Sequence, residues 1–445
     1  MAGKYCIAQK YEWRHGSDTF GPDNRAGRGL FLLYTAYEMQ RSWLNAASTW
    51  ASVGAELLSN PALPFGYTGM GPVMASALEV FAHASAPYGK PAFDIETVTV
   101  DGATHPVTEA IVMHRPFGNL LRFTHPGLPA DAPRLLIVAP MSGHFATLLR
   151  GTVARMIERC EVYITDWADA KMVPLDAGRF DLDDYIDYVV SYLEHIGPGA
   201  HMLAVCQPSV PALAATALMN AQKHPARPLS LTMMGGPVDT REAPTSVNDM
   251  AMQRPIEWFR HTVIATVPLQ YPGAGRRVYP GFLQLAGFMS MNLGNHMLSH
   301  YHMFKHLVAG ADEDAEATKA FYDEYRAVCD MDADYYLQTV QEVFQRQSLA
   351  KGEFMHRGTR IDLGAIRDTA LLAVEGERDD ISGIGQTKAA LKLATNLAEA
   401  RKKYLLAPDV GHYGIFNGSK WRDHIAPVLE DWIKRHDKAR LQVAA

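Results

Sequence analysis

The chain has 445 residues, of which 48% are hydrophobic and 20% are charged, and its formal net charge is −6. This composition is that of an ordinary soluble globular protein, and it lacks the basic excess of proteins that bind nucleic acids or anionic membranes. We therefore expect neither partner. The length suffices for one large domain with an elaborate insertion, or for two modest domains.

The four cysteines lie far apart and include no pair with metal-ligand spacing such as C-x-x-C. This argues against a structural zinc site and against a disulfide framework, and it suits a reducing compartment. The N-terminal residues contain no apolar core of signal-peptide length, and no run reaches the ~18 to 20 apolar residues of a membrane span. We therefore expect a cytoplasmic protein without a membrane span.

The first part of the chain predicts an arm, a helix and a strand pair. Residues 1–27 are polar and weakly patterned, and we expect a loose arm. Apolar residues recur at helical spacing over residues 30–58, which predicts one long amphipathic helix. It could dock on a hydrophobic surface, but we expect it to pack on its own domain. Alternating segments at 97–100 and 109–113, with Asp101-Gly102 between them, predict an antiparallel pair at a sheet edge.

The pattern then changes to short apolar runs bounded by turn residues, which are typical of strands buried on both faces. These runs lie at residues 135–139, 162–165, 202–205, 229–234, 371–374 and 404–406. Helical patterns separate most of them, at residues 182–195, 209–222, 385–398 and 421–435. The alternation predicts an α/β chain with a mostly parallel sheet.

One segment between two predicted strands is much longer than an ordinary connecting loop. Some 130 residues separate the strands at 229–234 and 371–374, whereas ordinary connecting loops have a median of about 4–6 residues. The segment is rich in aromatic residues and methionine, so we expect it to fold as a lid over the carboxyl ends of the strands.

The segment 201–210, HMLAVCQPSV, contains the most informative pattern of the sequence. A short apolar run leads into Cys206, small or turn-prone residues lie two positions away on each side, and a helical pattern follows at once. This is the strand, sharp turn and helix of a nucleophile elbow, with a cysteine where serine is more usual. A helix N-terminus and an adjacent imidazole would both activate such a thiol. We therefore expect Cys206 to be a nucleophile rather than a buried, inert cysteine.

An acid and then a histidine follow downstream, each after a predicted strand. His412 would take the thiol proton and later protonate the leaving group or activate water, while the acid would hold the imidazole in the required tautomer. Asp379 and Asp380 are adjacent, and only one can point at His412; the spacing from the preceding glycine favours Asp379. Asp239 is a weaker third candidate. Nucleophile, acid and histidine in this chain order are typical of an α/β-hydrolase.

The tetrahedral intermediate of such an enzyme needs hydrogen-bond donors for its oxyanion. The backbone amide of Gln207 would supply one, and Ser142, in the loop that ends the strand at 135–139, is our candidate for the second. The same loop could also be a plain turn.

Four lid histidines form two pairs with i, i+4 spacing, namely His296, His300, His302 and His306. No carboxylate or H-E-x-x-H pattern accompanies them, so we expect structural or substrate-lining roles and no metal.

These patterns predict an α/β-hydrolase fold with a mostly parallel central sheet and a large, mainly helical lid insertion. Residues 1–27 would form the arm, 28–236 the first part of the core with its N-terminal helix, 237–369 the lid, and 370–445 the second part of the core.

The chain also resembles a known family, the intracellular poly(3-hydroxybutyrate) depolymerases, cysteine-type enzymes that mobilise stored polyester granules in bacteria. The strings that carry the resemblance are YEMQR (37–41), YGKP (88–91), APMSGH (139–144), YITDW (163–167), AVCQPSV (204–210), MGGPVDTR (234–241), VYPGFLQL (278–285), EGERDDISG (375–383) and GHYG (411–414). The resemblance extends from about residue 33 to the last helix, and the arm before Gly27 is the one departure from it.

The resemblance implies the nucleophile Cys206, the acid Asp379 and the histidine His412. The implied reaction is cleavage of 3-hydroxyalkanoate ester bonds through a thioester acyl-enzyme, releasing 3-hydroxybutyrate or short oligomers. In this family coenzyme A can replace water as the acceptor, and no other cofactor is expected. The implied partner is the polyhydroxybutyrate polymer at the surface of a cytoplasmic storage granule. A homodimer is expected from enzyme base rates alone.

Two alternatives stay open at this point. Polyhydroxyalkanoate synthases resemble this family in fold and also use a cysteine with aspartate and histidine. A non-catalytic, granule-associated protein would bind polyester without cleaving it, although all three triad residues are present here.

Overall fold

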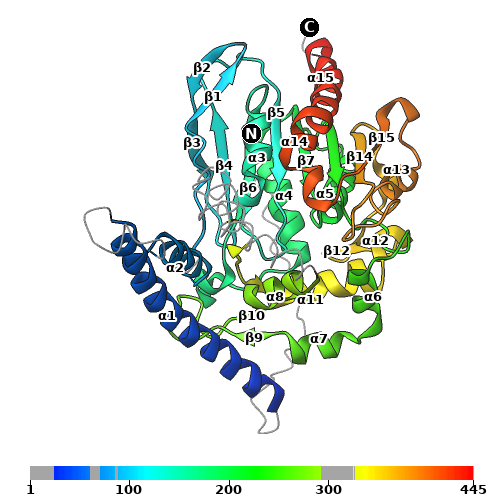
Figure 1. Ribbon diagram of the computed structural model, residues 1–445. Coiled ribbons are helices and arrows are strands. Elements are labelled where there is room, and N and C mark those ends of the chain that lie inside the picture. The colour runs from blue at the N-terminus through cyan, green and yellow to red at the C-terminus, as the bar shows by residue number, and fades with distance from the viewer. Residues whose placement is uncertain (1–24, 61–70, 86–88, 292–323, 325, 444–445) are drawn as a thin grey trace.

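The computed structural model describes residues 25–60, 71–85, 89–291, 324 and 326–443 (Figure 1). Most of the expected arm therefore lies outside the described residues. The predicted N-terminal helix is present as α1 (Arg25–Ser59), and α2 (Gly71–Ser85) packs beside it. No described helix combines the length and the hydropathy needed to cross a membrane.

A mixed eight-stranded sheet forms the centre of the molecule, in the order β15-β14-β8-β7-β5-β6-β4-β3. Its strands are β3 (Thr108–Met113), β4 (Gly118–Thr124), β5 (Arg134–Val138), β6 (Glu161–Trp167), β7 (Ala200–Val205), β8 (Ser230–Met234), β14 (Ala370–Gly376) and β15 (Lys402–Ala407). Pairing is parallel from β6 through to β15, and antiparallel only where β4 pairs with β3 and β6. The six predicted strands and the mostly parallel sheet are thus confirmed.

The strands β7, β8 and β14 are buried along their whole length, as their continuous apolar runs predict. Burial on both faces was the wrong expectation for β15. It pairs with β14 alone at the edge of the sheet, and most of its residues are only partly buried.

The predicted strand pair at 97–100 and 109–113 is also wrong in its pairing. Asp101 and Gly102 have φ values of 50° and 85°, the conformation of a tight two-residue hairpin turn. The chain therefore reverses at once, and β1 (Thr97–Val100) pairs with β2 (Ala103–Pro106). The strand β3 pairs instead with β4, which the sequence pattern had not indicated.

The core helices are α3 (Arg150–Met156), α4 (Leu182–Ile196), α5 (Ser209–Ala221), α13 (Ala389–Leu393), α14 (Gly418–Lys420) and α15 (Ala426–Val443). The last predicted helix is confirmed, although a π-helical segment, η9 (Trp421–Ile425), precedes α15. Short 3-10 helices are η2 (Ala146–Leu149), η3 (Ala170–Met172), η4 (Leu175–Ala177), η6 (Leu363–Ala365), η7 (Glu399–Arg401) and η8 (His412–Ile415).

The predicted helix at 385–398 is wrong, because only α13 within it is helical. The buried carboxylate of Glu375 accepts hydrogen bonds from the backbone amides of Gly385, Thr387 and Lys388 at 2.8–2.9 Å. Because of these bonds, the start of the segment forms a loop around Glu375, and the helix begins only at Ala389.

The insertion lies across one end of the sheet, below it in Figure 1. Its described helices are α6 (Ser246–Gln253), α7 (Ile256–Thr262), α8 (Gly281–Met291), α11 (Ala333–Thr339), the π-helical η5 (Val340–Gln345) and α12 (Ser348–Lys351). Small antiparallel pairings join β9 (Ala265–Thr266), β10 (Arg277–Tyr279) and β11 (Met331–Asp332), and separately β12 (Met355–His356) and β13 (Thr359–Arg360). The insertion is thus mainly helical, and α1 runs along its outer side (Figure 1).

An aromatic cluster fastens the insertion to the core. The ring of Tyr335 on α11 stacks on Tyr185 of α4, with centroids 5.5 Å apart and an interplanar angle of 13°. Trp167, at the end of β6, packs against the other side of this cluster, 4.3 Å from the ring of Tyr185. These ring contacts pack α11 against α4 and the end of β6.

Candidate active site

Cys206 lies at a strained turn between β7 and α5. Its φ of 67° is in the left-handed region, which residues other than glycine rarely adopt. Two hydrogen bonds hold the turn: the Cys206 amide donates to the Met234 carbonyl at 2.7 Å, and the Ser209 amide donates to the Cys206 carbonyl at 3.0 Å. This is the conformation of a nucleophile elbow, and it leaves the thiol half-buried at the edge of a cavity.

Two glycines at the end of β8 allow this close packing. A Cβ atom on Gly236 would lie 2.1 Å from the Ser209 hydroxyl and 2.7 Å from the Cys206 carbonyl oxygen. A Cβ on Gly235, whose φ is 59°, would lie 3.1 Å from Asp379 Oδ2 and 3.3 Å from His412 Cε1. The backbone of this strand end therefore forms one wall of the candidate site.

Asp379 and His412 are brought together from the loops after β14 and β15. His412 Nδ1 lies 2.8 Å from Asp379 Oδ2, and the Asp379 carboxylate is completely buried. The other oxygen, Oδ1, accepts hydrogen bonds from the amides of Ile381 and Ser382, both at 2.9 Å. These bonds fix the carboxylate, which in turn orients the imidazole.

The two rival acids are placed elsewhere. Asp380 is exposed to solvent, and Asp239 forms a two-pronged ion pair with Arg241, with both nitrogen-to-oxygen distances at 2.7 Å. Of the three acids named from the sequence, only Asp379 contacts His412.

The surroundings of His412 favour its protonated form. Burial alone would lower the pKa of His412, but the charge of a Cys206 thiolate and hydrogen bonds to Asp379 and Cys206 raise that pKa well above its usual value. The imidazole of His412 therefore keeps its proton to a higher pH than a free imidazole would.

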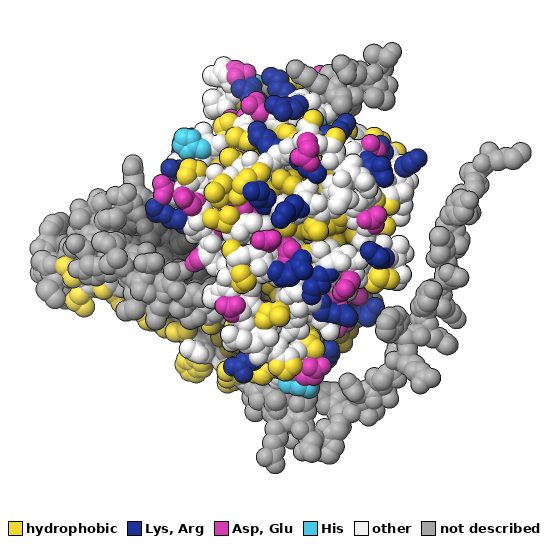
Figure 2. Space-filling model, turned by 90° about the vertical axis from the view of Figure 1, so that its right-hand side faces the viewer, with side chains coloured by type: hydrophobic (Ala, Val, Ile, Leu, Met, Phe, Trp, Pro, Cys, Tyr) yellow, Lys and Arg dark blue, Asp and Glu magenta, His cyan; other side chains and the backbone are white. Residues whose placement is uncertain are grey.

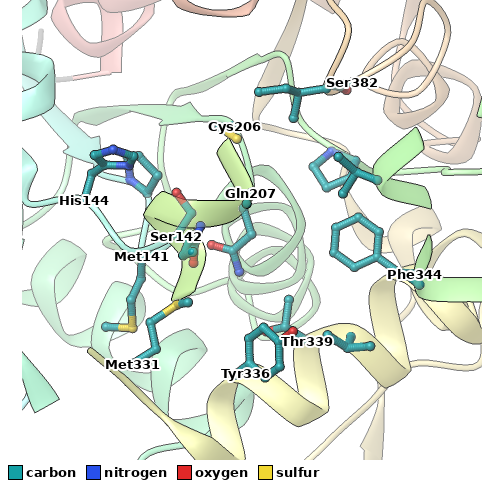
Figure 3. A pocket seen from close by; sticks show the side chains of 18 of the residues that line it. Met141, Ser142, His144, Cys206, Gln207, Met331, Tyr336, Thr339, Phe344 and Ser382 are labelled. Carbon is teal, nitrogen blue, oxygen red and sulfur yellow. The ribbon is translucent and has the colours of Figure 1, made fainter. Parts of the chain in front are cut away.

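Ser142 and Gln207, the two residues named for the oxyanion, both line the cavity beside Cys206 (Figure 3). The strand end that leads to Ser142 is firmly held, because the Ala139 carbonyl accepts hydrogen bonds from the Trp167 indole at 2.8 Å and from the Tyr185 hydroxyl at 3.1 Å. The oxyanion role of both residues stays a prediction.

The cavity has a volume of about 430 Å³ and is lined by residues of both the core and the insertion. Most of its lining is apolar, contributed by Met141, Leu148, Met250, Phe259, Tyr279, Met331, Tyr336, Val340, Phe344, Ile381 and Phe416. Polar groups gather near Cys206, as in a site for a mainly apolar ligand with a few oxygen atoms. The aromatic richness of the insertion indicated such a lining, but no pattern identified Tyr335 or Thr339 as cavity residues.

The four lid histidines, His296, His300, His302 and His306, lie outside the described residues. Within the described ranges, no three His, Cys, Asp or Glu side chains are grouped so that they could hold a metal ion.

Residues 235–437 match the family model described as PHB de-polymerase C-terminus. The matched segment covers 203 of the 445 residues. It begins at Gly235 and contains Asp379 and His412, whereas Cys206 precedes it. No curated protein matches the sequence.

Solved structures of hydrolases are similar to the chain at low sequence identity. A putative lipase from Acinetobacter baumannii AYE is 12% identical, with a TM-score of 0.40 over 74% of this chain and 93% of that chain. A thermophilic esterase from Thermogutta terrifontis is 12% identical, with a TM-score of 0.40 over 77% and 97%. A 2-hydroxy-6-oxo-6-phenylhexa-2,4-dienoate hydrolase from Rhodococcus sp. strain RHA1 is 11% identical, with a TM-score of 0.40 over 74% and 100%. The chain has an α/β-hydrolase fold, and the strand order and elbow described above define it.

Proposed function

We propose that the protein is a polyhydroxybutyrate depolymerase that cleaves 3-hydroxyalkanoate esters with a Cys206, His412 and Asp379 triad. The observation that carries the proposal is the 2.8 Å contact between His412 and Asp379, within the segment that matches the depolymerase family, beside a cysteine at a strained elbow. The apolar cavity at this site suits a polyester chain, whose repeats are apolar apart from their ester oxygens.

The first half of the reaction forms a thioester. The Cys206 thiolate attacks the carbonyl carbon of an ester, a carbon–sulfur bond forms, and negative charge develops on the carbonyl oxygen. The Gln207 amide and the loop at Ser142 would donate hydrogen bonds to that oxygen. The ester carbon–oxygen bond then breaks, and the His412 imidazolium gives its Nε2 proton to the departing oxygen, which leaves as a hydroxyl end.

The second half of the reaction releases the acyl group. His412 takes a proton from the acceptor, whose oxygen or sulfur attacks the thioester carbonyl, and the carbon–sulfur bond breaks to restore the Cys206 thiolate. Water as the acceptor gives 3-hydroxybutyrate or a short oligomer. Coenzyme A as the acceptor gives the corresponding acyl-CoA.

The proposed setting is the surface of a polyester storage granule in the cytoplasm, and the proposed assembly is a homodimer. Both are part of the proposal. The family match of residues 235–437 supports a polymer substrate and bears on neither the setting nor the assembly.

The test is release of 3-hydroxybutyrate from native amorphous granules, with and without coenzyme A, by wild type and by Cys206→Ala. Cys160→Ala is the matched control, because burial raises the pKa of that thiol to about 12 and keeps it inert. We expect release by wild type and by the control, and none by Cys206→Ala. Equal release by Cys206→Ala, or consumption of hydroxybutyryl-CoA into polymer, would overturn the assignment.

A further inference from the structure

Three polar side chains beside the nucleophile are buried, and no described residue outside this group pairs with them. They are the amide of Gln207, the hydroxyl of Tyr335 and the hydroxyl of Thr339, whose residues are 8%, 1% and 7% exposed. All three line the cavity. Because buried polar groups almost always use their hydrogen-bonding capacity, a group of three that can pair only with one another indicates a place for a polar ligand atom.

The three groups come from opposite walls and lie close together. Gln207 directly follows Cys206, and Figure 3 shows its side chain extending into the cavity toward the helix that carries Thr339. Tyr335 and Thr339 are four residues apart on α11 and so share one helix face. Burial raises the pKa of Tyr335, while side-chain hydrogen bonds with Gln207 and Thr339 lower it, so the three groups lie within hydrogen-bonding reach of one another.

We propose that Gln207, Tyr335 and Thr339 bind the oxygen on carbon 3 of the acyl unit that Cys206 attacks. The inference rests on the proposed function, because a 3-hydroxyalkanoate repeat carries an oxygen two carbons beyond its carbonyl carbon. In a chain-terminal unit that oxygen is a hydroxyl, which can donate to the Gln207 carbonyl and accept from the two hydroxyl groups. In an internal unit it is an ester oxygen, which only accepts, and the hydroxyl groups donate.

This subsite makes the enzyme selective for 3-hydroxyacyl over plain acyl groups of the same length. A plain butyryl group would leave the three buried polar groups with only one another as partners, and sites built around a substrate hydroxyl reject analogues that lack it. The apolar remainder of the cavity would still accept the carbon chain.

The test compares p-nitrophenyl 3-hydroxybutyrate with p-nitrophenyl butyrate, which differ only in the hydroxyl. We expect wild type to prefer the hydroxylated ester in kcat/KM by at least about tenfold, and Tyr335→Phe or Thr339→Val each to reduce that ratio about three- to tenfold. Tyr192→Phe is the matched control, since its buried hydroxyl bonds to the Gly118 carbonyl outside this cavity. The control keeps the wild-type ratio.

No preference in wild type, or an unchanged ratio in both variants, would overturn the subsite. This outcome is separate from failure of the proposed function. A wild type that prefers the hydroxylated ester but releases nothing from granules would support the subsite and refute granule depolymerisation.

A second inference concerns the outer surface of α1 and α2, which is unusually apolar. Its exposed large hydrophobic side chains are Leu33, Met39, Trp43, Leu44, Trp50, Val53 and Leu57 on α1, and Val73, Met74 and Phe81 on α2. Trp43 and Trp50 are 76% and 78% exposed. Residues 42–55 of α1 contain no charged residue. Large exposed apolar side chains gathered on two packed helices indicate an interaction site.

Other residues fasten α1 and α2 to each other and to the insertion. The Ser48 hydroxyl donates to the Ala82 carbonyl at 2.9 Å, which joins the two helices. The ring of Tyr37 stacks on Phe282 with centroids 4.1 Å apart, and Phe282 begins α8, which contributes Gln284 to the cavity lining. These contacts attach α1 and α2 to α8, an element of the cavity wall.

We infer that this surface docks on solid, uncharged polyester, an inference that also rests on the proposed function. A neutral polymer offers no ionic partners, and the outer surface of α1 between residues 42 and 55 presents none. The side of the molecule over β15 and α13 differs, because lysine, arginine, aspartate and glutamate are interspersed there (Figure 2). Docking through α1 and α2 would hold the cavity wall close to the polymer.

The test is the Trp43→Ser/Trp50→Ser double variant, measured by sedimentation with amorphous polyhydroxybutyrate particles and by the ratio of particle to soluble-trimer hydrolysis. Leu269→Ser is the matched control, because Leu269 is an 89% exposed apolar residue elsewhere on the insertion. We expect about tenfold or greater loss of both particle binding and the rate ratio in the double variant only.

Unchanged particle binding by the double variant would overturn the docking surface. So would analytical ultracentrifugation that finds a wild-type dimer and a monomeric double variant whose particle binding is intact, because the surface would then join two copies of the chain. Cys206-dependent hydrolysis of the soluble trimer reports on the proposed function independently.

Discussion

Replacing Gly235 by alanine should disturb the geometry of the proposed triad without substituting any of its residues. The new Cβ would lie 3.1 Å from both Asp379 Oδ2 and Ile415 Cδ1, and 3.3 Å from His412 Cε1. These distances are tighter than ordinary contacts, so the acid and the histidine must move by a few tenths of an ångström. The φ of 59° adds backbone strain of roughly 1–2 kcal/mol.

We expect Gly235→Ala to lower the free energy of unfolding by about 1–2 kcal/mol and to lower kcat/KM on a 3-hydroxybutyrate trimer by about tenfold or more. Gly102→Ala separates the two effects, because Gly102 has a φ of 85° but nothing within 4 Å of its would-be Cβ, in the β1–β2 turn. That control should lose similar stability and no activity. Full activity in Gly235→Ala would refute the packing that we describe around the triad.

The remaining predictions concern the two buried carboxylates of the β14 segment. Asp379→Asn should lower kcat/KM by about 10²–10⁴-fold and lower the pKa of His412, so the alkaline limb of the pH–rate profile should move to lower pH; an unmoved limb would contradict the coupling. Because the pKa of His412 is raised in the folded state, protonated His412 stabilises the fold fully below its unfolded-state pKa of about 6.5. This stabilisation is lost as pH rises through the folded-state pKa. The stability deficit of Asp379→Asn should therefore shrink with rising pH. Glu375→Gln should lower the unfolding free energy by about 3 kcal/mol or more, because Glu375 accepts four hydrogen bonds, including one from the Tyr404 hydroxyl at 2.8 Å. Thermal and urea unfolding beside Glu399→Gln, whose side chain is 87% exposed, would check this, and equal stability of the two variants would contradict it.

Features of the chain that are local in sequence could be predicted. The continuous apolar runs that became β7, β8 and β14 indicate strands buried on both faces wherever they occur. The elbow around Cys206 could be recognised because strand, turn and helix follow one another within ten residues. The order of the candidate triad residues along the chain then predicted the fold class.

Features that depend on distant partners could not be predicted. The pairing of β3 with β4 was missed because the Asp101-Gly102 turn pairs β1 with β2, which leaves β3 free to pair with β4. The prediction of a helix at 385–398 was wrong because the backbone amides of Gly385 and Thr387 donate hydrogen bonds to the carboxylate of Glu375, which lies ten or more residues earlier. Tyr335 and Thr339 reach the cavity only through the packing of α11 on the core, which no local pattern encodes.

The most direct test of the central claim is to trap the acyl-enzyme. Wild type would be mixed with a 3-hydroxybutyrate trimer, quenched in acid within milliseconds to seconds, and digested for peptide mass spectrometry. We predict a hydroxybutyryl thioester on the peptide that contains Cys206, absent from Cys206→Ala and from unreacted protein. An adduct on a serine such as Ser142, or turnover by Cys206→Ala with no adduct on any peptide, would contradict a cysteine-based mechanism.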